Sequence, residues 1–150
     1  MTGSAWIRSA LIAVLLGSIW PFILAQLFAF SGRVTVPLIR TVADLGIAEN
    51  VPLMARMLSA VIWALVLGVL FGVPLGLAVR KNLIAYWLVF VASVLTVSAA
   101  IALHSGSGLG ILLLEWSLPE TWIHIFAVLG VGYLAARFRN RRERARIVAP

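Results

Sequence analysis

The sequence contains no cysteine among its 150 residues. This absence excludes disulfide bonds, thiol catalysis and thiolate metal sites. Charged residues are also scarce, because they make up 11% of the chain where a soluble domain has about a quarter. Hydrophobic residues reach 63%, which is more apolar surface than a globule of this length can bury. We therefore expect lipid to be the solvent around most of the chain.

The long apolar stretches carry no charged residue near their middles. Four stretches reach the roughly 20 mostly apolar residues that a spanning helix needs. They cover residues 6–30, 53–79, 83–103 and 118–138. Transporters coupled to protons or ions usually place an ionisable group near the middle of the membrane, despite its cost. The lack of such a group disfavours coupled transport, although it does not exclude a passive pore.

These stretches predict an all-α integral membrane protein built as a bundle of four transmembrane helices. Residues 1–138 would form the transmembrane domain, and residues 139–150 would form a basic cytoplasmic tail. The first stretch is too long for a typical signal peptide, and no clear cleavage site follows it, so we expect a retained helix.

Two connecting segments have features of their own. Between the first two spans, Pro37 can begin a short amphipathic helix that Gly46 would end, which predicts an interfacial helix in the first external loop. An ordinary connecting loop is the alternative. After the third span, the glycine-rich segment 104–110 predicts a turn. The apolar segment 111–116 is too short to span, so it would dip into the membrane or lie at its surface.

The distribution of basic residues predicts the orientation. With the N-terminus inside, nine of the twelve basic residues fall on the inner side and three on the outer side. The positive-inside rule then places both termini in the cytoplasm of a bacterial-type inner membrane. Six arginines lie at the end of the fourth span and after it, and they are expected to anchor this end of the chain at anionic lipid. They are Arg137, Arg139, Arg141, Arg142, Arg144 and Arg146.

A stripe of five small residues is the strongest pattern in the chain. Its members recur at a spacing of four: Ala60, Ala64, Gly68, Gly72 and Gly76. Positions four apart lie nearly above one another on a helix, so the stripe forms a groove where another helix can approach closely. The approaching helix belongs either to the same bundle or to a second chain. Five small positions exceed the two or three that one crossing uses, which favours a partner.

Four ionisable residues map to the outer end of the predicted bundle and are weak candidates for a metal site: His104, Glu115, Glu120 and His124. Imidazole and carboxylate groups bind zinc, but no recognised ligand motif is present. Ser117 and Glu120 have the spacing of a capping box, so Glu120 is expected to cap the fourth helix and His124 to bond to Glu120. We therefore predict no metal, no cofactor and no catalytic residue.

The sequence thus favours a small inner-membrane protein that is not an enzyme. It would act by helix–helix association with another membrane protein, as an accessory subunit, a regulator or an immunity-type inhibitor. The alternative is a small homo-oligomeric channel or transporter, in which Ser93, Thr96 and the glycine-rich turn line a path between protomers. Expected partners are membrane lipids and another integral membrane protein or a second copy. Nucleic acid is not expected, because no aromatic residues interleave the basic tail.

Overall fold

The computed structural model describes residues 3–44, 51–79, 82–106 and 108–148, which form helices joined by short links, with no strand among them. In chain order, the elements are α1 (Gly3–Asp44), α2 (Val51–Leu67), the π-helical turn η2 (Gly68–Gly72), α3 (Val73–Ala78), α4 (Leu83–His104), α5 (Gly108–Ser117) and α6 (Pro119–Val148). Within these residues, four segments are long and apolar enough to cross a membrane: Ala5–Leu27, Leu53–Ala78, Leu83–His104 and Pro119–Glu143. The prediction of an all-helical protein with four such helices is confirmed.

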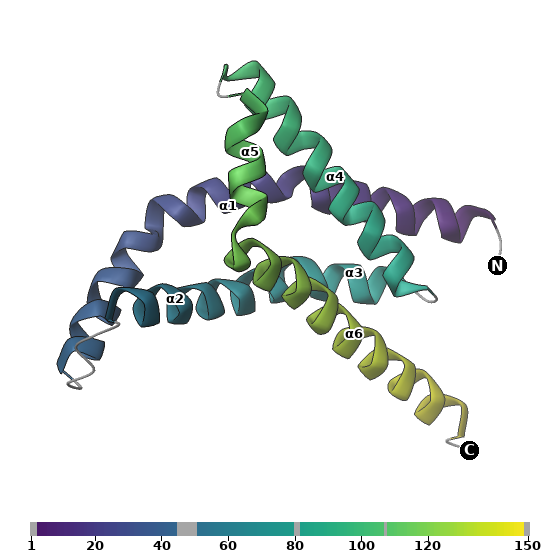
Figure 1. Cartoon of the computed structure of the whole chain (residues 1–150). Coiled ribbons are helices and arrows are strands. Elements are labelled where there is room, and N and C mark those ends of the chain that lie inside the picture. The colour runs from purple at the N-terminus through teal and green to yellow at the C-terminus, as the bar shows by residue number, and fades with distance from the viewer. Residues whose placement is uncertain (1–2, 45–50, 80–81, 107, 149–150) are drawn as a thin grey trace.

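Helix α1 continues well past the first span. Its 42 residues correspond to about 63 Å of helix at 1.5 Å per residue, about twice the thickness of the hydrocarbon core. Pro21 and Pro37 both lie inside it, and the helix continues through each with the loss of one backbone bond. The predicted separate interfacial helix is therefore not observed, because residues 31–44 belong to α1, which bends in its second half (Figure 1). Gly46, the predicted stop, lies outside the described residues.

The second span is not one regular helix. Helix α2 is followed by η2 and then by α3, in which Pro74 occupies the first turn. A proline ring clashes with the carbonyl group four residues earlier, here that of Leu70, and a wider π-turn at this point relieves the clash. Pro74 is thus accommodated by the π-helical turn η2 just before it.

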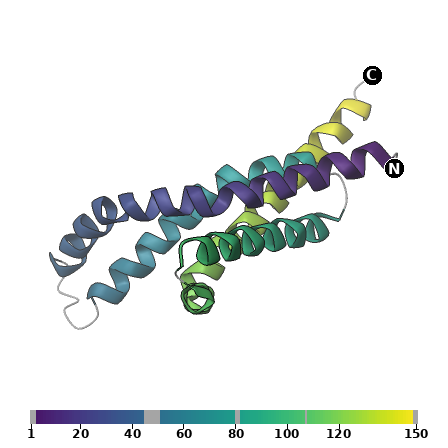
Figure 2. The same ribbon diagram turned by 90° about the horizontal axis from the view of Figure 1, so that it is seen from above.

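The spans run in alternate directions along the bundle. The start of α1, the end of α3 and the end of α6 lie at one end, which we call the terminal end (Figures 1 and 2). The end of α1 and the start of α2 lie at the other, which we call the loop end. The hydroxyl group of Ser9 donates a hydrogen bond of 3.0 Å to the Ala78 carbonyl at the terminal end. Both described ends of the chain therefore lie on the same side of the bundle.

The core lies where α1, η2 and α4 meet. Trp20, Phe71 and Phe90 pack ring against ring, with centroid distances of 5.0, 5.5 and 6.1 Å. Helices α1 and α4 cross closely beside this cluster, because a Cβ added at Gly17 would lie 2.5 Å from the Phe90 carbonyl oxygen and 2.7 Å from the Cβ of Ser93. Gly17 is thus required for the α1–α4 contact.

The glycine-rich turn leads into a crosswise helix. Gly106 and Gly108 have φ values of 69° and 72°, which glycine adopts without steric cost, so the predicted turn is observed. Helix α5 follows and has 10 residues, too few to span a membrane. Figure 2 looks nearly along the axis of α5, whereas α1 and α2 lie across the view. Helix α5 therefore runs steeply across the spans rather than beside them.

Candidate functional site

The stripe of small residues is covered by α6 of the same chain. A Cβ added at Gly72 would lie 2.6 Å from the Val128 carbonyl oxygen, and one added at Gly76 would overlap the Gly132 carbonyl group. These contacts are between backbones, so no side-chain movement can make room for a larger residue. Only glycine fits at these two positions, because the backbone of α6 lies directly against them.

The alanine half of the stripe is covered as well. Ala60 and Ala64 are buried, and His124 of α6 donates from Nε2 to the Ala60 carbonyl oxygen at 3.1 Å. All five stripe residues are therefore used in packing within the monomer. A second chain has no access to the stripe in this arrangement, which supports the internal-packing alternative and removes the main reason for placing a partner there.

Glu120 does not cap α6 as predicted. Its carboxylate forms an ion pair with Arg56 of α2, and its side chain is only 12% exposed. The hydroxyl group of Ser117 donates instead to the Leu114 carbonyl oxygen at 2.6 Å, inside α5. His124 bonds to α2 rather than to Glu120. The capping-box residues thus hold α2 against α6 at the loop end and terminate α5.

The four candidate metal ligands do not form one cluster. His104 is exposed at the end of α4, whereas Glu120 and His124 face α2. Among the residues that the structure describes, no group of three His, Cys, Asp or Glu side chains is placed to hold a metal ion. Glu115 is separate from the other three and lies on α5, beside a cavity.

This cavity, of about 340 Å³, lies where α1, α4, α5 and the start of α6 meet. Its wall is mostly apolar and includes both Trp20 and Trp116. Thr121 closes one side, since its hydroxyl group donates to the Glu115 main-chain oxygen at 2.8 Å. Burial raises the pKa of the Glu115 carboxyl above its ordinary value, because the charged form loses hydration there. A site of this size with few polar groups is typical of a small-ligand pocket.

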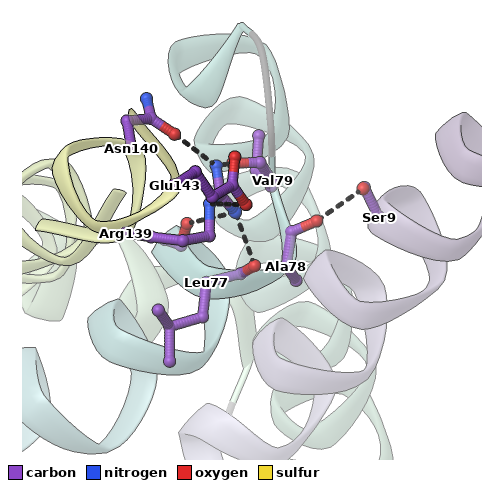
Figure 3. A network of polar contacts seen from close by, with 8 residues as sticks. Ser9, Leu77, Ala78, Val79, Arg139, Asn140 and Glu143 are labelled. Atoms are coloured by element: carbon purple, nitrogen blue, oxygen red, sulfur yellow. Dashed lines mark hydrogen bonds and ion pairs between the residues drawn. The ribbon is translucent and has the colours of Figure 1, made fainter. Parts of the chain in front are cut away.

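A polar network at the terminal end joins three helices through Arg139. Its guanidinium group donates to the Leu77 carbonyl oxygen at 2.6 Å and to the Val79 carbonyl oxygen at 3.0 Å, with a longer contact of 3.4 Å to that of Gly76 (Figure 3). These are carbonyl groups that the end of α3 leaves without helical partners. Ser9 of α1 satisfies the remaining one at Ala78. Arg139 is therefore a C-terminal cap of α3 contributed by α6.

The other tail arginines differ from Arg139. Helix α6 extends to Val148, so most of the predicted basic tail is helical and continuous with the fourth span. Arg137, Arg141 and Arg142 are exposed on it, whereas the side chains of Arg144 and Arg146 lie outside the described part. Their role as lipid anchors stays a prediction. The side chain of Arg139, in contrast, points toward the end of α3.

A second concave region lies on the outside of the bundle between α4 and α6. This groove, of about 860 Å³, is apolar and is lined by residues that include Ala85, Leu88, Phe126, Gly130 and Tyr133. A Cβ added at Gly130 would meet no atom within 4 Å, so the floor of the groove is open. The stacked rings of Trp87 and Phe126, with centroids 5.6 Å apart, support one wall. We call this region the α4–α6 groove.

The proposed pore-lining residues do not share a surface. Ser93 donates to the Val89 carbonyl at 3.0 Å and packs against Gly17, whereas Thr96 is exposed and donates to the Ala92 carbonyl at 2.8 Å. Both hydroxyl groups are thus satisfied inside α4. This arrangement gives no support to a polar path along α4.

Sequence reasoning missed three residues that organise the bundle: Gly17, Gly132 and Arg139. Gly132 is buried and receives Gly72 and Gly76 of the second span. Arg139 lies seven residues, about two helical turns, after Gly132 and so on the same face of α6. This shared helix face could have been recognised in the sequence, because the arginines on either side of Arg139 lie on other faces of α6.

Comparison with known proteins identifies no relative of this chain. It matches no protein family, and no curated protein and no solved structure is significantly similar to it. Any function must therefore be inferred from the chain's own residues.

Proposed function

We propose that this chain acts without catalysis, by helix–helix association with another membrane protein, and that the partner helix lies in the α4–α6 groove. The open, side-chain-free floor at Gly130 carries this proposal. It replaces the stripe on the second span as the docking surface, because α6 already occupies the stripe.

The shape of the groove favours a helix over lipid. Association in a membrane depends on close packing, and helix interfaces are enriched in small residues that let backbones approach. A lipid chain packs on any apolar surface and gains nothing specific from a missing side chain. Gly130 of α6 and Ala85 of α4 both line the groove, so two small residues leave room for one further helix.

The same shape favours a different protein over a second copy. In a two-fold dimer the same patch meets itself, and two concave grooves facing each other would leave both unfilled. A partner with a projecting apolar helix complements the groove directly. A second copy, as in a homo-oligomeric channel or transporter, is kept as an outcome of the test.

Gly130→Leu is expected to abolish association with the partner while leaving the fold intact, because leucine would fill an open floor without meeting the bundle. The partner should co-purify in mild detergent with the wild type and with Gly110→Leu, a matched control whose site is also open but lies on α5. A single cysteine at Ala85 should cross-link to the same partner, and the chain has no native cysteine to remove.

The result of the cross-linking decides between occupants. One partner protein, lost with Gly130→Leu and retained with Gly110→Leu, supports the proposal. A cross-link between two copies of this chain would replace it with self-association. If the folded variant with a single cysteine at Ala85 cross-links to no protein, lipid occupies the groove and the proposal is contradicted.

We also propose that both termini lie in the cytoplasm of a bacterial-type inner membrane. Support comes from the excess of basic residues at the terminal end, together with the positive-inside rule. Reporters fused after Arg146 or within residues 80–82 should read cytoplasmic, and those near Glu49 or Gly108 should read external. A cytoplasmic signal at Gly108 would overturn the four-span arrangement.

A further inference from the structure

The cavity between α1, α4, α5 and α6 has a feature that packing does not explain. Glu115 lines it as a half-buried carboxylate, and it forms no hydrogen bond or ion pair with any residue that the structure describes. Ser98 of α4 lines the same cavity, and its hydroxyl group likewise lacks a hydrogen bond within the described residues. Other hydroxyl groups on α4, those of Ser93 and Thr96, donate back to their own helix.

Unsatisfied polar groups of this kind are costly in a partly buried setting. A carboxylate that loses water without gaining a partner is destabilised, and a neutral hydroxyl group loses its hydrogen bonds. Glu120, near the loop end, differs from Glu115 because it has a protein partner. It is paired with Arg56. Among the described residues that line the cavity there is no Arg or Lys. A ligand that enters the cavity can therefore supply the partner that Glu115 does not find among the described residues.

We propose that this cavity binds an apolar molecule bearing a primary ammonium group, with the ammonium paired to Glu115 and hydrogen-bonded to Ser98. The apolar body would lie against Leu24, Val94 and Leu112. This binding site is distinct from the α4–α6 groove, since no residue lines both.

The chemistry of the wall selects an ammonium over other groups. Trp20 and Trp116 line the same cavity as the carboxylate, and indole rings attract cations through their π faces. A carboxylate with no basic neighbour repels an anion such as a phosphate or a fatty-acid headgroup. A metal ion would require further oxygen or nitrogen ligands, and the described residues offer no group of three acidic or imidazole side chains. An ammonium needs only one carboxylate and a hydroxyl acceptor.

Two sources can supply this chemistry: the headgroup of an aminophospholipid, or a free alkylamine. Both present a primary ammonium at the end of an apolar body, and the cavity is open on one side. The two sources compete for one site, so an experiment in membranes of defined composition separates them.

The test uses decylamine and decanol, which share one alkyl chain and differ in the headgroup. The full-length protein in phosphatidylcholine nanodiscs should bind decylamine saturably, detected by a change in tryptophan fluorescence that empty nanodiscs do not show. Decanol should bind at least about tenfold more weakly, since one charge-assisted hydrogen bond corresponds to about this factor. A photoreactive decylamine should label peptides of α4 and α5.

Glu115→Gln should weaken decylamine binding about tenfold and leave decanol binding unchanged, because glutamine keeps the shape and removes the charge. Asp44→Asn, which removes an exposed carboxylate on α1, is the matched control and should change neither. Ala102→Phe, which fills the cavity from α4, should abolish both binding and photolabelling. Size-exclusion chromatography of each variant establishes that it is folded.

The outcomes are decisive in each direction. Adding phosphatidylethanolamine to the nanodiscs should raise the apparent decylamine Kd if the lipid headgroup is the natural ligand, and should leave it unchanged if a free amine is. Equal binding of decylamine and decanol, or an unaltered Kd in folded Glu115→Gln, would overturn the ammonium site. An absence of saturable binding would overturn it as well.

Discussion

Replacing Gly76 with leucine is expected to prevent α3 from packing on α6 and to leave little protein that can be recovered as a folded monomer. Even one added carbon at this position would overlap the Gly132 carbonyl group, and both groups belong to helix backbones. Overpacking of a well-packed core costs about 1–3 kcal/mol when side chains can adjust. Here only a movement of whole helices relieves the overlap, so we expect a loss of about 3 kcal/mol or more.

The measurement is the fraction of detergent-solubilised protein that elutes as a monodisperse species, together with its temperature of aggregation. Gly32→Leu is the matched control, because a Cβ at Gly32 on α1 would meet no atom within 4 Å. It should behave as the wild type or gain slightly, since leucine favours a helix over glycine by roughly 0.5–1 kcal/mol. Equal recovery of Gly76→Leu and Gly32→Leu would contradict the α3–α6 contact.

The stripe of small residues shows which part of the packing could be predicted from the sequence and which could not. A spacing of four predicted that one face of the second span is packed against a helix, and all five residues are indeed buried. The spacing carries no information on which helix that is, because close approach requires only the absence of side chains on the near helix. The answer lies on α6, at Gly132, whose carbonyl group faces Gly76. The excess length of the stripe has the same origin, since α6 follows the second span over most of its length.

Two local patterns led to assignments that the structure corrects, each for its own physical reason. Pro37 does not begin a new helix, whereas the S-x-x-E sequence at Ser117 correctly marks the start of α6 at Pro119 but not the role of Glu120. Pro37 lies inside a continuous α1 because one lost backbone bond does not end a long helix. Glu120 turns away from its own helix because Arg56 of α2 offers a charged partner. The pairing of Glu120 depends on a residue distant in sequence, so the local pattern did not reveal it.

The cavity and the α4–α6 groove were also beyond the reach of the sequence. Both depend on the angles between helices, which composition does not encode. The steep course of α5 brings Glu115 to the cavity, and a ten-residue apolar segment gives no indication of that direction. Only the hydrophobic lengths, the turn at Gly106 and the buried face of the second span follow directly from the residue order.

Replacing Arg139 with glutamine is expected to lower the free energy of unfolding by about 1.5–3 kcal/mol, the range for losing hydrogen bonds that involve a charged group. Its side chain is only 16% exposed, and its guanidinium group satisfies carbonyl groups at the end of α3 that have no helical partners. Arg139→Lys should recover only part of the loss, because an ammonium cannot reproduce the planar fork of a guanidinium group. The measurement is unfolding in mixed micelles with increasing denaturing detergent.

Arg141→Gln is the matched control, since Arg141 lies two residues further along α6 and is exposed. If the tail arginines served only as anchors to anionic lipid, each would contribute roughly 1 kcal/mol to membrane binding, and the two substitutions would have equal effects. The cap predicts a difference instead: Arg139→Gln destabilises the bundle in neutral detergent, where no anionic lipid is present, and Arg141→Gln does not. Equal unfolding curves for the two variants in neutral detergent would return Arg139 to the group of lipid anchors, and would leave the last carbonyl groups of α3 to be satisfied by water.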